Sequence, residues 1–265
     1  MINKELDTLL KQLRLPTFRD NYADLAQQAA KEDLSYTEYL LHLARAEAQI
    51  RRYNQIQRLV KLSRLPLEKT FVNFDFKKLP LGITQQAKVL SEGMFVDKCE
   101  NILAFGRPGS GKTHLLCGIC HELARQGRRV YFTTCDLMVQ QLLRAKQELE
   151  LDKLLKKLSM YDVLMIDDFG YVKQNREEME VLFSLLAYRY ERGSMLITSN
   201  LPFSRWQEVF KDPMTTAAAI DRLVHHSVIL ELNVDSYRAQ AARDRADKHK
   251  SEEDKKDNDK DKSDH

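Results

Sequence analysis

Short apolar runs recur through the middle of the chain, and stretches with helical periodicity separate most of them. Five such runs predict buried strands: Ile102–Phe105, Val130–Thr133, Val163–Ile166, Met195–Thr198 and Val228–Leu232. The intervening pattern is helical in Leu137–Lys146 and Glu177–Arg189, among others. Such alternation is typical of a parallel sheet with helices on both faces. We therefore predict an α/β domain over residues 66–240, built on a parallel five-stranded sheet.

The first 65 residues follow a different pattern, with helical periodicity and no glycine. One apolar stripe ends near Pro16 and consists of Leu6, Leu9, Leu10 and Leu13. The tetrad Ser35-Tyr36-Thr37-Glu38 matches a capping box, which predicts a second helix that runs towards Pro66. Residues 1–65 are therefore predicted to form a small all-helical domain, to which we assign DNA or partner binding as a hypothesis.

Charge is distributed unevenly along the chain, although the net charge is only +3. The second predicted helix is basic in its later part, at Arg45, Arg51, Arg52, Arg58, Lys61 and Arg64. These side chains form either a solvated helix face or a set of contacts to a phosphate backbone, and the spacing leaves both interpretations open. Residues 241–265 mix both signs with almost no apolar residue, so they predict a charged disordered tail.

Hydropathy and cysteine spacing indicate the expected cellular compartment and the role of the cysteines. The chain contains no apolar stretch of membrane-spanning length, and its N-terminus lacks the apolar core of a signal peptide. We therefore expect a cytoplasmic protein with no membrane partner. Cys117 and Cys120 form a CxxC, but no second Cys or His pair stands at metal-site spacing, so core packing is the favoured interpretation.

The strongest motif follows the first predicted strand. The segment Gly106–Thr113 fits the pattern GxxxxGK[ST], in which backbone N–H groups surround phosphate oxygens and a helix N-terminus follows. Lys112 is expected to reach the β- and γ-phosphates, and the Thr113 hydroxyl to bind Mg²⁺. The predicted nucleotide-binding residues are Gly106, Pro108, Gly109, Ser110, Gly111, Lys112, Thr113 and His114. We therefore predict that the chain binds a nucleoside triphosphate with Mg²⁺.

Two further strands end in polar residues. Asp167 and Asp168 follow the third strand, at the sheet edge where open α/β sheets bind ligands. Asp167 can hold Mg²⁺ through water, and Asp168 can orient the attacking water. Asn200 follows the fourth strand, where its amide can contact the γ-phosphate and the water, or can simply form a turn.

Two other groups have less specific patterns. The aromatics of residues 70–76 either pack at a domain edge or contact a base. His225 and His226 are potential metal ligands, but adjacent histidines are expected to point apart, and the sequence offers no partner for them. Arg222 precedes them, and its spacing alone is that of a helix-surface residue.

Taken in order, the motifs resemble those of the IstB family. They are the phosphate loop with His114, the segment Leu164–Tyr171, Arg189-Tyr190-Glu191, Thr198–Phe203 with Trp206 and Phe210, Asp221–His226, and Ser236-Tyr237-Arg238. Leu13–Pro16, Ser35-Tyr36 and Glu47 with Arg51 fit the leading helical region of that family. The resemblance implies an AAA+ P-loop ATPase, similar to DnaC helicase loaders, and it covers nearly everything before the tail.

The resemblance also implies roles. Lys112 and Thr113 fall on Walker A, Asp167 and Asp168 on Walker B, and Asn200 on sensor 1. Arg222 falls on the arginine that acts in trans, and Arg238 on a sensor-2-like position. The implied activity is ATP hydrolysis by a homo-oligomer that loads on double-stranded DNA and recruits or stimulates a transposase. A DnaC-type replicative helicase loader is the alternative. A small-molecule kinase is a third hypothesis, but it usually needs a basic lid, and no lid-like arginine cluster follows the phosphate loop in this sequence.

The sequence departs from the AAA+ pattern at Walker B, where Asp-Glu is usual and this chain has Asp167-Asp168. The shorter side chain retracts the second carboxylate by about 1.5 Å. Slower hydrolysis is the expected consequence.

Overall fold

The computed structural model describes residues 2–170, 176–202, 205–206 and 213–232. Arg238 and the predicted tail lie outside these residues. The chain divides into two compact units, residues 1–59 and 60–265. No helix in the described part of the chain is long and apolar enough to cross a membrane.

The first unit contains helices α1 (Ile2–Gln12), α2 (Pro16–Lys31) and most of α3, which runs from Tyr36 to Leu62. The predicted capping box opens α3: the Ser35 backbone N–H donates to Glu38 Oε2 at 2.9 Å, and the Glu38 N–H donates back to Ser35 Oγ at 3.3 Å. Helix α2 was not expected. Pro16 begins it rather than only ending α1, because the fixed φ of proline suits the first turn of a helix.

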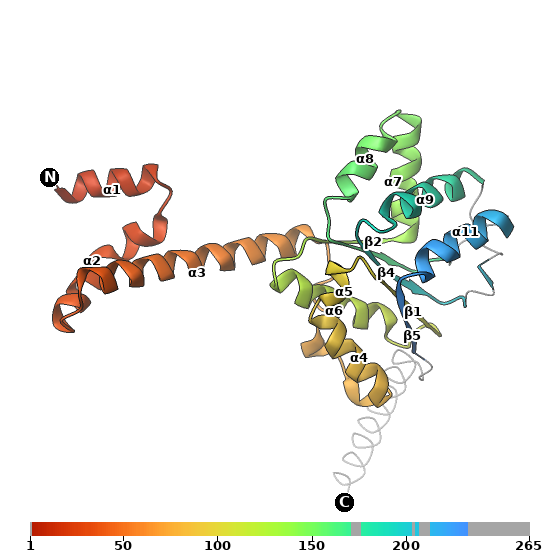
Figure 1. The fold of residues 1–265 in the computed structure, drawn as a ribbon, viewed down its shortest axis with the longest axis horizontal. Helices are drawn as coiled ribbons and strands as arrows, with labels where there is room; N and C mark the ends of the chain where they lie inside the picture. The colour runs from red at the N-terminus through yellow and green to blue at the C-terminus, as the bar shows by residue number, and fades with distance from the viewer. Residues whose placement is uncertain (1, 171–175, 203–204, 207–212, 233–265) are drawn as a thin grey trace, which may run out of the picture. The chain divides into compact units, whose positions relative to one another are not determined.

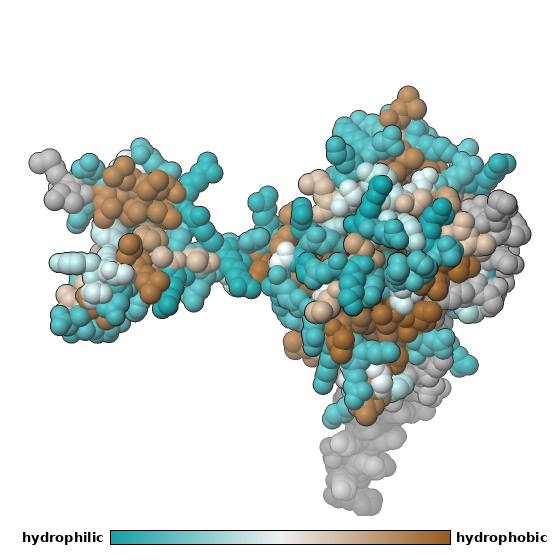
Figure 2. Space-filling model, in the orientation of Figure 1, coloured by the Kyte–Doolittle hydropathy of each residue, from teal (hydrophilic) through white to brown (hydrophobic). Residues whose placement is uncertain are grey.

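The first unit has a small core. Its buried side chains are Leu10, Thr17, Ala29, Leu43 and Glu47. The predicted leucine stripe is only partly buried, since Leu9 and Leu13 of that stripe are 48% and 66% exposed. Figure 2 accordingly shows hydrophobic side chains gathered over α1.

Glu47 is the charged residue of this core. Its carboxylate accepts from the Thr17 backbone N–H at 2.9 Å and from Arg51 Nε at 2.6 Å. Burial by itself raises the pKa of Glu47, and the hydrogen bonds from Arg51 and Thr17 outweigh it, so the net pKa is lowered. Arg51 also donates to the Arg14 carbonyl, which ties the α1–α2 turn to α3.

The second unit is built on a parallel sheet of five strands, in the order β2-β3-β4-β1-β5. The strands are β1 (Asn101–Gly106), β2 (Val130–Thr134), β3 (Val163–Asp167), β4 (Ser194–Ser199) and β5 (Ser227–Leu232). Each contains one of the predicted strands. The predicted α/β fold with a five-stranded parallel sheet flanked by helices is therefore confirmed.

Helices cover both faces of the sheet (Figure 1). One face packs against α4 (Leu81–Ser91), α5 (Met94–Asp97) and α6 (Lys112–Arg125), through side chains such as Ile102, Met165 and Leu196. The other packs against α7 (Cys135–Gln147), α8 (Leu151–Leu158), α9 (Arg176–Arg189) and α11 (Pro213–Val224). Two short 3₁₀ helices, η1 (Phe71–Asn73) and η2 (Phe76–Lys78), precede α4.

Buried polar and sulfur groups complete this core. Cys117 and Cys120 are fully buried in α6, with their sulfurs 3.9 and 3.7 Å from Met165 Sδ, as the packing interpretation predicts. Burial raises the pKa of the Cys117 thiol to about 12, so it is protonated at neutral pH. Arg189 is 1% exposed and donates to the backbone carbonyls of Leu158, Tyr161, Asp162 and Ser194.

Strand order explains why residues far apart in sequence meet. β1 lies beside β4, and β4 lies beside β3. Phe105 of β1 lies opposite Ser199 of β4, and Ile166 of β3 lies opposite Ile197 of β4. The segments that follow these three parallel strands therefore emerge together at one sheet edge, the position at which open α/β sheets bind ligands.

A candidate nucleotide site at the carboxyl edge of the sheet

A glycine-rich loop joins β1 to α6, and its backbone conformation requires glycine. Gly109 and Gly111 have φ values of 83° and 91°, which side-chain-bearing residues rarely adopt. At Gly106, φ is 152° and a Cβ would lie 2.4 Å from the Leu232 carbonyl oxygen, so the backbone of β5 closes against the loop. Gly111 caps the N-terminus of α6, which directs the helix dipole at the loop.

Lys112 lies at the carboxyl edge of the sheet, and its side chain is only 5% exposed. Its Nζ donates to the carbonyl oxygens of Gly106 and Arg107, at 2.8 and 2.9 Å, and to Asn200 Oδ1 at 2.7 Å. The ammonium therefore connects the phosphate loop with the end of β4. An ammonium at this position can also donate to a strongly charged phosphate oxygen when one is present.

Asp167 ends β3 and receives two hydroxyl hydrogen bonds. Thr113 Oγ1 donates to Asp167 Oδ1 at 2.7 Å, and Thr198 Oγ1 donates to the same oxygen at 2.6 Å. Asp167 is 6% exposed and Thr198 is fully buried. The pair Thr113 and Asp167 places a hydroxyl and a carboxylate side by side, which are the hard oxygen ligands that suit Mg²⁺ and its bound waters.

Asp168 follows in an exposed position with φ of 57°. Its backbone N–H donates to Thr198 Oγ1 at 2.9 Å. A left-handed backbone is several times more common for Asp than for most residues that bear a Cβ, because the short polar side chain tolerates it. The backbone at this position therefore suits aspartate better than the glutamate usual in AAA+ proteins.

Thr198 is a site residue that was not predicted. The strand that contains it reads as a continuous apolar run, so its hydroxyl resembles a minor interruption in a buried strand. In the structure this hydroxyl touches both acidic residues, as donor to Asp167 and as acceptor from the Asp168 N–H. The segment Thr198-Ser199-Asn200 was noted as a motif, but the pairing of β3 with β4 was needed to assign Thr198.

These groups line a cavity of about 460 Å³. The lining residues are Lys69, Asn73, Phe74, Asp75, Pro108, Gly109, Gly111, Lys112, Thr113, His114, Asp167, Asp168 and Asn200. A volume of this size is within the usual range for small-molecule sites. All five predicted polar residues Lys112, Thr113, Asp167, Asp168 and Asn200 thus meet in one cavity.

The aromatic segment before α4 packs against this cavity and also against the domain. Phe74 lines the cavity and meets the His114 ring edge-on, with ring centroids 5.0 Å apart. His114 Nε2 lies 2.9 Å from the Thr70 carbonyl oxygen, which fixes the segment to α6. Phe71 packs on Gly118, where a Cβ would lie 2.3 Å from the ring. Both earlier interpretations of these aromatics are therefore compatible with the structure.

Three of the predicted residues that the structure describes, Gly106, Ser110 and Arg222, are not among those that line the cavity. Ser110 is in the loop, and its buried hydroxyl has no hydrogen-bond partner among the described residues. Arg222 is on α11, where its guanidinium lies 4.7 Å from the Phe183 ring centroid and donates to the Ala218 carbonyl at 3.2 Å. Arg238 lies outside the described residues.

The residues present fit a nucleoside triphosphate and Mg²⁺. The glycine cradle, the N-terminus of α6 and Lys112 supply donors and positive charge for phosphates, and the unpartnered Ser110 hydroxyl adds a polar group beneath the loop. The Thr113 hydroxyl and the Asp167 carboxylate supply oxygen ligands for the metal. Fold and site together define a P-loop nucleotide-binding protein with the AAA+ architecture.

Comparison with known proteins identifies the family. The sequence model described as IstB-like ATP binding protein matches residues 8–245, and the chain belongs to this family. A putative insertion sequence ATP-binding protein of Sinorhizobium fredii is 40% identical over 246 residues, which are 92% of this chain and 82% of the relative. The insertion sequence IS21 putative ATP-binding protein of Pseudomonas aeruginosa is 38% identical over 240 residues, 90% of each chain.

Solved structures support the fold. AMPPCP-bound DnaA from Aquifex aeolicus is similar with a TM-score of 0.54 at 18% identity, over 70% of this chain and 56% of that one. The DnaC helicase loader is similar with a TM-score of 0.50 at 20% identity, over 57% of this chain and 87% of that one. The resemblance to the IstB family and to helicase-loader folds is therefore confirmed.

Proposed function

We propose that this protein is an ATPase that assists transposition of an insertion element, assembling with ATP on double-stranded DNA and recruiting or stimulating the transposase of the element. The observation that carries the proposal is the convergence of Lys112, Thr113, Asp167 and Asn200 in one cavity. Relatives named as insertion sequence ATP-binding proteins, matched over most of the chain, favour this setting.

Each cavity residue has a distinct part in hydrolysis. Lys112 and the loop N–H groups bind and neutralise the phosphates, while the Asn200 amide, already held by Lys112, contacts the γ-phosphate or the attacking water. Thr113 and, through water, Asp167 hold Mg²⁺, which when bound polarises the phosphates. Asp168 orients the attacking water, and Thr198 keeps both acids in place.

Arg222 is proposed to complete the site of a neighbouring subunit. Its position on α11, packed on Phe183 and outside the cavity lining, is compatible with action in trans. An arginine supplied in this way raises the turnover rate by about 10³–10⁵-fold in well-studied systems. Arg238 is proposed as a weaker, sensor-2-like contact to the same nucleotide.

ATP turnover by single variants tests the chemistry. Lys112→Ala is expected to abolish hydrolysis, whereas Lys157→Ala, which changes an exposed lysine on α8, keeps it. Arg222→Ala is expected to be inactive alone, and Arg144→Ala, an exposed arginine on α7, is its control. Unimpaired hydrolysis by Lys112→Ala would remove the proposed site.

A mixing experiment then tests the shared site. Subunits with Lys112→Ala still offer Arg222, and subunits with Arg222→Ala still offer Lys112. Mixing the two inactive proteins is therefore expected to restore part of the activity at mixed interfaces. Full activity of Arg222→Ala alone would contradict action in trans.

The basic part of α3 is the proposed DNA contact. The structure engages Arg51 with Glu47 and stacks Arg64 on the Tyr131 ring, so these two have structural roles. Arg45 and Arg52 are exposed and seven residues apart, which places them on the same helix face. Replacing both by Ala is expected to weaken duplex binding and to lower the slope of log affinity against log salt by about 2.

The alternative of a helicase loader rests on the DnaC likeness, which concerns the fold alone. A pull-down with the full chain distinguishes the two partners. Retention of the element's transposase supports the proposal, and retention of a replicative helicase instead supports the alternative.

A further inference from the structure

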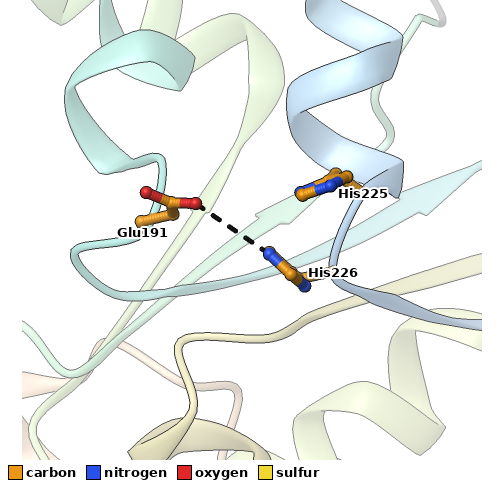
Figure 3. Close-up of side chains that lie close together, drawn as sticks. All are labelled: Glu191, His225 and His226. Atoms are coloured by element: carbon orange, nitrogen blue, oxygen red, sulfur yellow. Dashed lines mark ion pairs between the residues drawn. The ribbon is translucent and has the colours of Figure 1, made fainter.

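A second cluster of chemically active side chains lies away from the nucleotide cavity, at the opposite end of the strands. Glu191, His225 and His226 come from the turn after α9 and from the junction between α11 and β5. One ligand atom from each lies within 4.8 Å of the others. Figure 3 shows the Glu191 carboxylate facing the His226 ring, with His225 beside it at the end of α11.

The two histidines do not point apart, contrary to the expectation from sequence. Their ring centroids are 4.1 Å apart, and His226 Nε2 lies 3.9 Å from Glu191 Oε1. The chain turns sharply from α11 into β5 between them, and this turn brings both rings to the same side. Glu191 is the partner that the sequence did not reveal, 34 residues before His225.

The backbone on each side of the cluster is fixed. The His225 N–H makes the last hydrogen bond of α11, to the Asp221 carbonyl at 2.9 Å, and the His226 carbonyl accepts from the Asn101 N–H at 2.7 Å. Glu191 lies two residues beyond the buried Arg189, whose guanidinium is fixed by four carbonyls. Backbone atoms that are held in place reduce the entropy lost when the exposed side chains close on a ligand.

A second interaction orients one of the rings. The Tyr190 hydroxyl lies 3.2 Å from His225 Nδ1. Histidines that bind metals usually engage their other ring nitrogen with an oxygen partner, which fixes the ring orientation.

We propose that Glu191, His225 and His226 form a site for a divalent transition metal, with Zn²⁺ as the expected occupant. Two imidazoles and one carboxylate are a zinc ligand set, whereas Mg²⁺ and Ca²⁺ prefer oxygen ligands alone. Tetrahedral zinc with bonds of about 2.0–2.1 Å needs ligand atoms roughly 3.3 Å apart. Rotation of three exposed side chains closes the present separation of up to 4.8 Å.

Such an ion would link the turn after α9 to the end of α11. Arg222 is on the last turn of α11, three residues before His225. The metal site therefore stands beside the helix that carries this arginine, but binding of the ion needs neither nucleotide nor a second subunit. The proposal is thus independent of the proposed ATPase activity.

Calorimetric titration of the full-length protein with Zn²⁺ tests the site, in a buffer with excess Mg²⁺ so that oxygen-ligand sites are filled. One equivalent is expected to bind, and His226→Ala is expected to weaken it by about 100-fold or more. Glu191→Gln, which keeps the shape of the side chain, is expected to weaken binding as well. Co²⁺ is the spectroscopic probe, because its visible absorption reports imidazole ligands in a tetrahedral site.

Two matched controls complete the test. His42→Ala removes an exposed histidine of α3, and His249→Ala removes a histidine far along the sequence from the proposed ligands; both are expected to bind Zn²⁺ as the unchanged protein does. Because His42, Glu191 and His226 are exposed, melting curves in chelator should be equal for the unchanged protein and the variants at these three positions. Unchanged Zn²⁺ affinity in His226→Ala, or an equal loss in His42→Ala, overturns the proposal.

Discussion

The Thr198 hydroxyl offers the sharpest test of how the site is held together. Thr198→Val keeps the shape of the side chain and removes only its hydrogen bonds, to Asp167 Oδ1 and from the Asp168 N–H. A bond to a charged group contributes about 1.5–3 kcal/mol and a neutral one about 0.5–1.5 kcal/mol. The free energy of unfolding is therefore expected to fall by about 2–4 kcal/mol, as measured by urea denaturation.

The same change separates positioning from binding. Thr198 does not belong to the cavity lining, so the nucleotide dissociation constant of Thr198→Val should change little. Turnover is expected to fall by about 10²-fold, because the two acids lose the group that places them. Thr198→Ser keeps the hydroxyl and should retain most of the activity. If Thr198→Val hydrolyses ATP normally, or if Thr198→Ser loses as much, the reasoning is wrong.

Three further predictions concern the framework. Arg189→Met leaves four carbonyls without their donor and should lower the free energy of unfolding by about 3–4 kcal/mol, whereas Arg144→Met on the exposed face of α7 changes it little, by urea denaturation. Gly118→Ala forces a Cβ against Phe71 and should cost about 1–3 kcal/mol; a smaller loss when Phe71 is replaced by Leu would support the clash, and an equal loss would not. Glu47 has a lowered pKa in the folded state, so its stabilisation is complete above its ordinary pKa of 4.5 and is lost as the pH falls below that value. Helix content followed against pH should show this loss in the unchanged protein and a flatter profile in Glu47→Gln.

The fold was largely predictable because its central strands β1, β3 and β4 are buried on both faces. Such strands appear in the sequence as continuous apolar runs, and the less buried edge strands β2 and β5 also contain apolar runs that predict them. Helix α2 was missed because Pro16 can end one helix or begin the next. The leucine stripe of α1 predicted a helix, but periodicity does not tell whether a face is covered, and Leu13 is exposed.

The candidate site was predictable where a motif acts through consecutive backbone atoms, as in Gly106–Thr113. Contacts that depend on strand order were not. Lys112 meets Asn200 across 88 residues, and Thr198 meets Asp167 across 31, because β4 lies between β1 and β3. The partnership of Glu191 with the two histidines depends in the same way on how a turn and a helix end are packed.

In the proposed function, nucleotide bound in the cavity drives assembly of the protein on DNA. Mass photometry of the full chain with duplex DNA and a non-hydrolysable ATP analogue measures this assembly directly. DNA-bound oligomers are expected with the analogue, and none are expected without nucleotide or with Lys112→Ala. Particles of monomer mass alone, with both DNA and the analogue present, would contradict nucleotide-driven assembly.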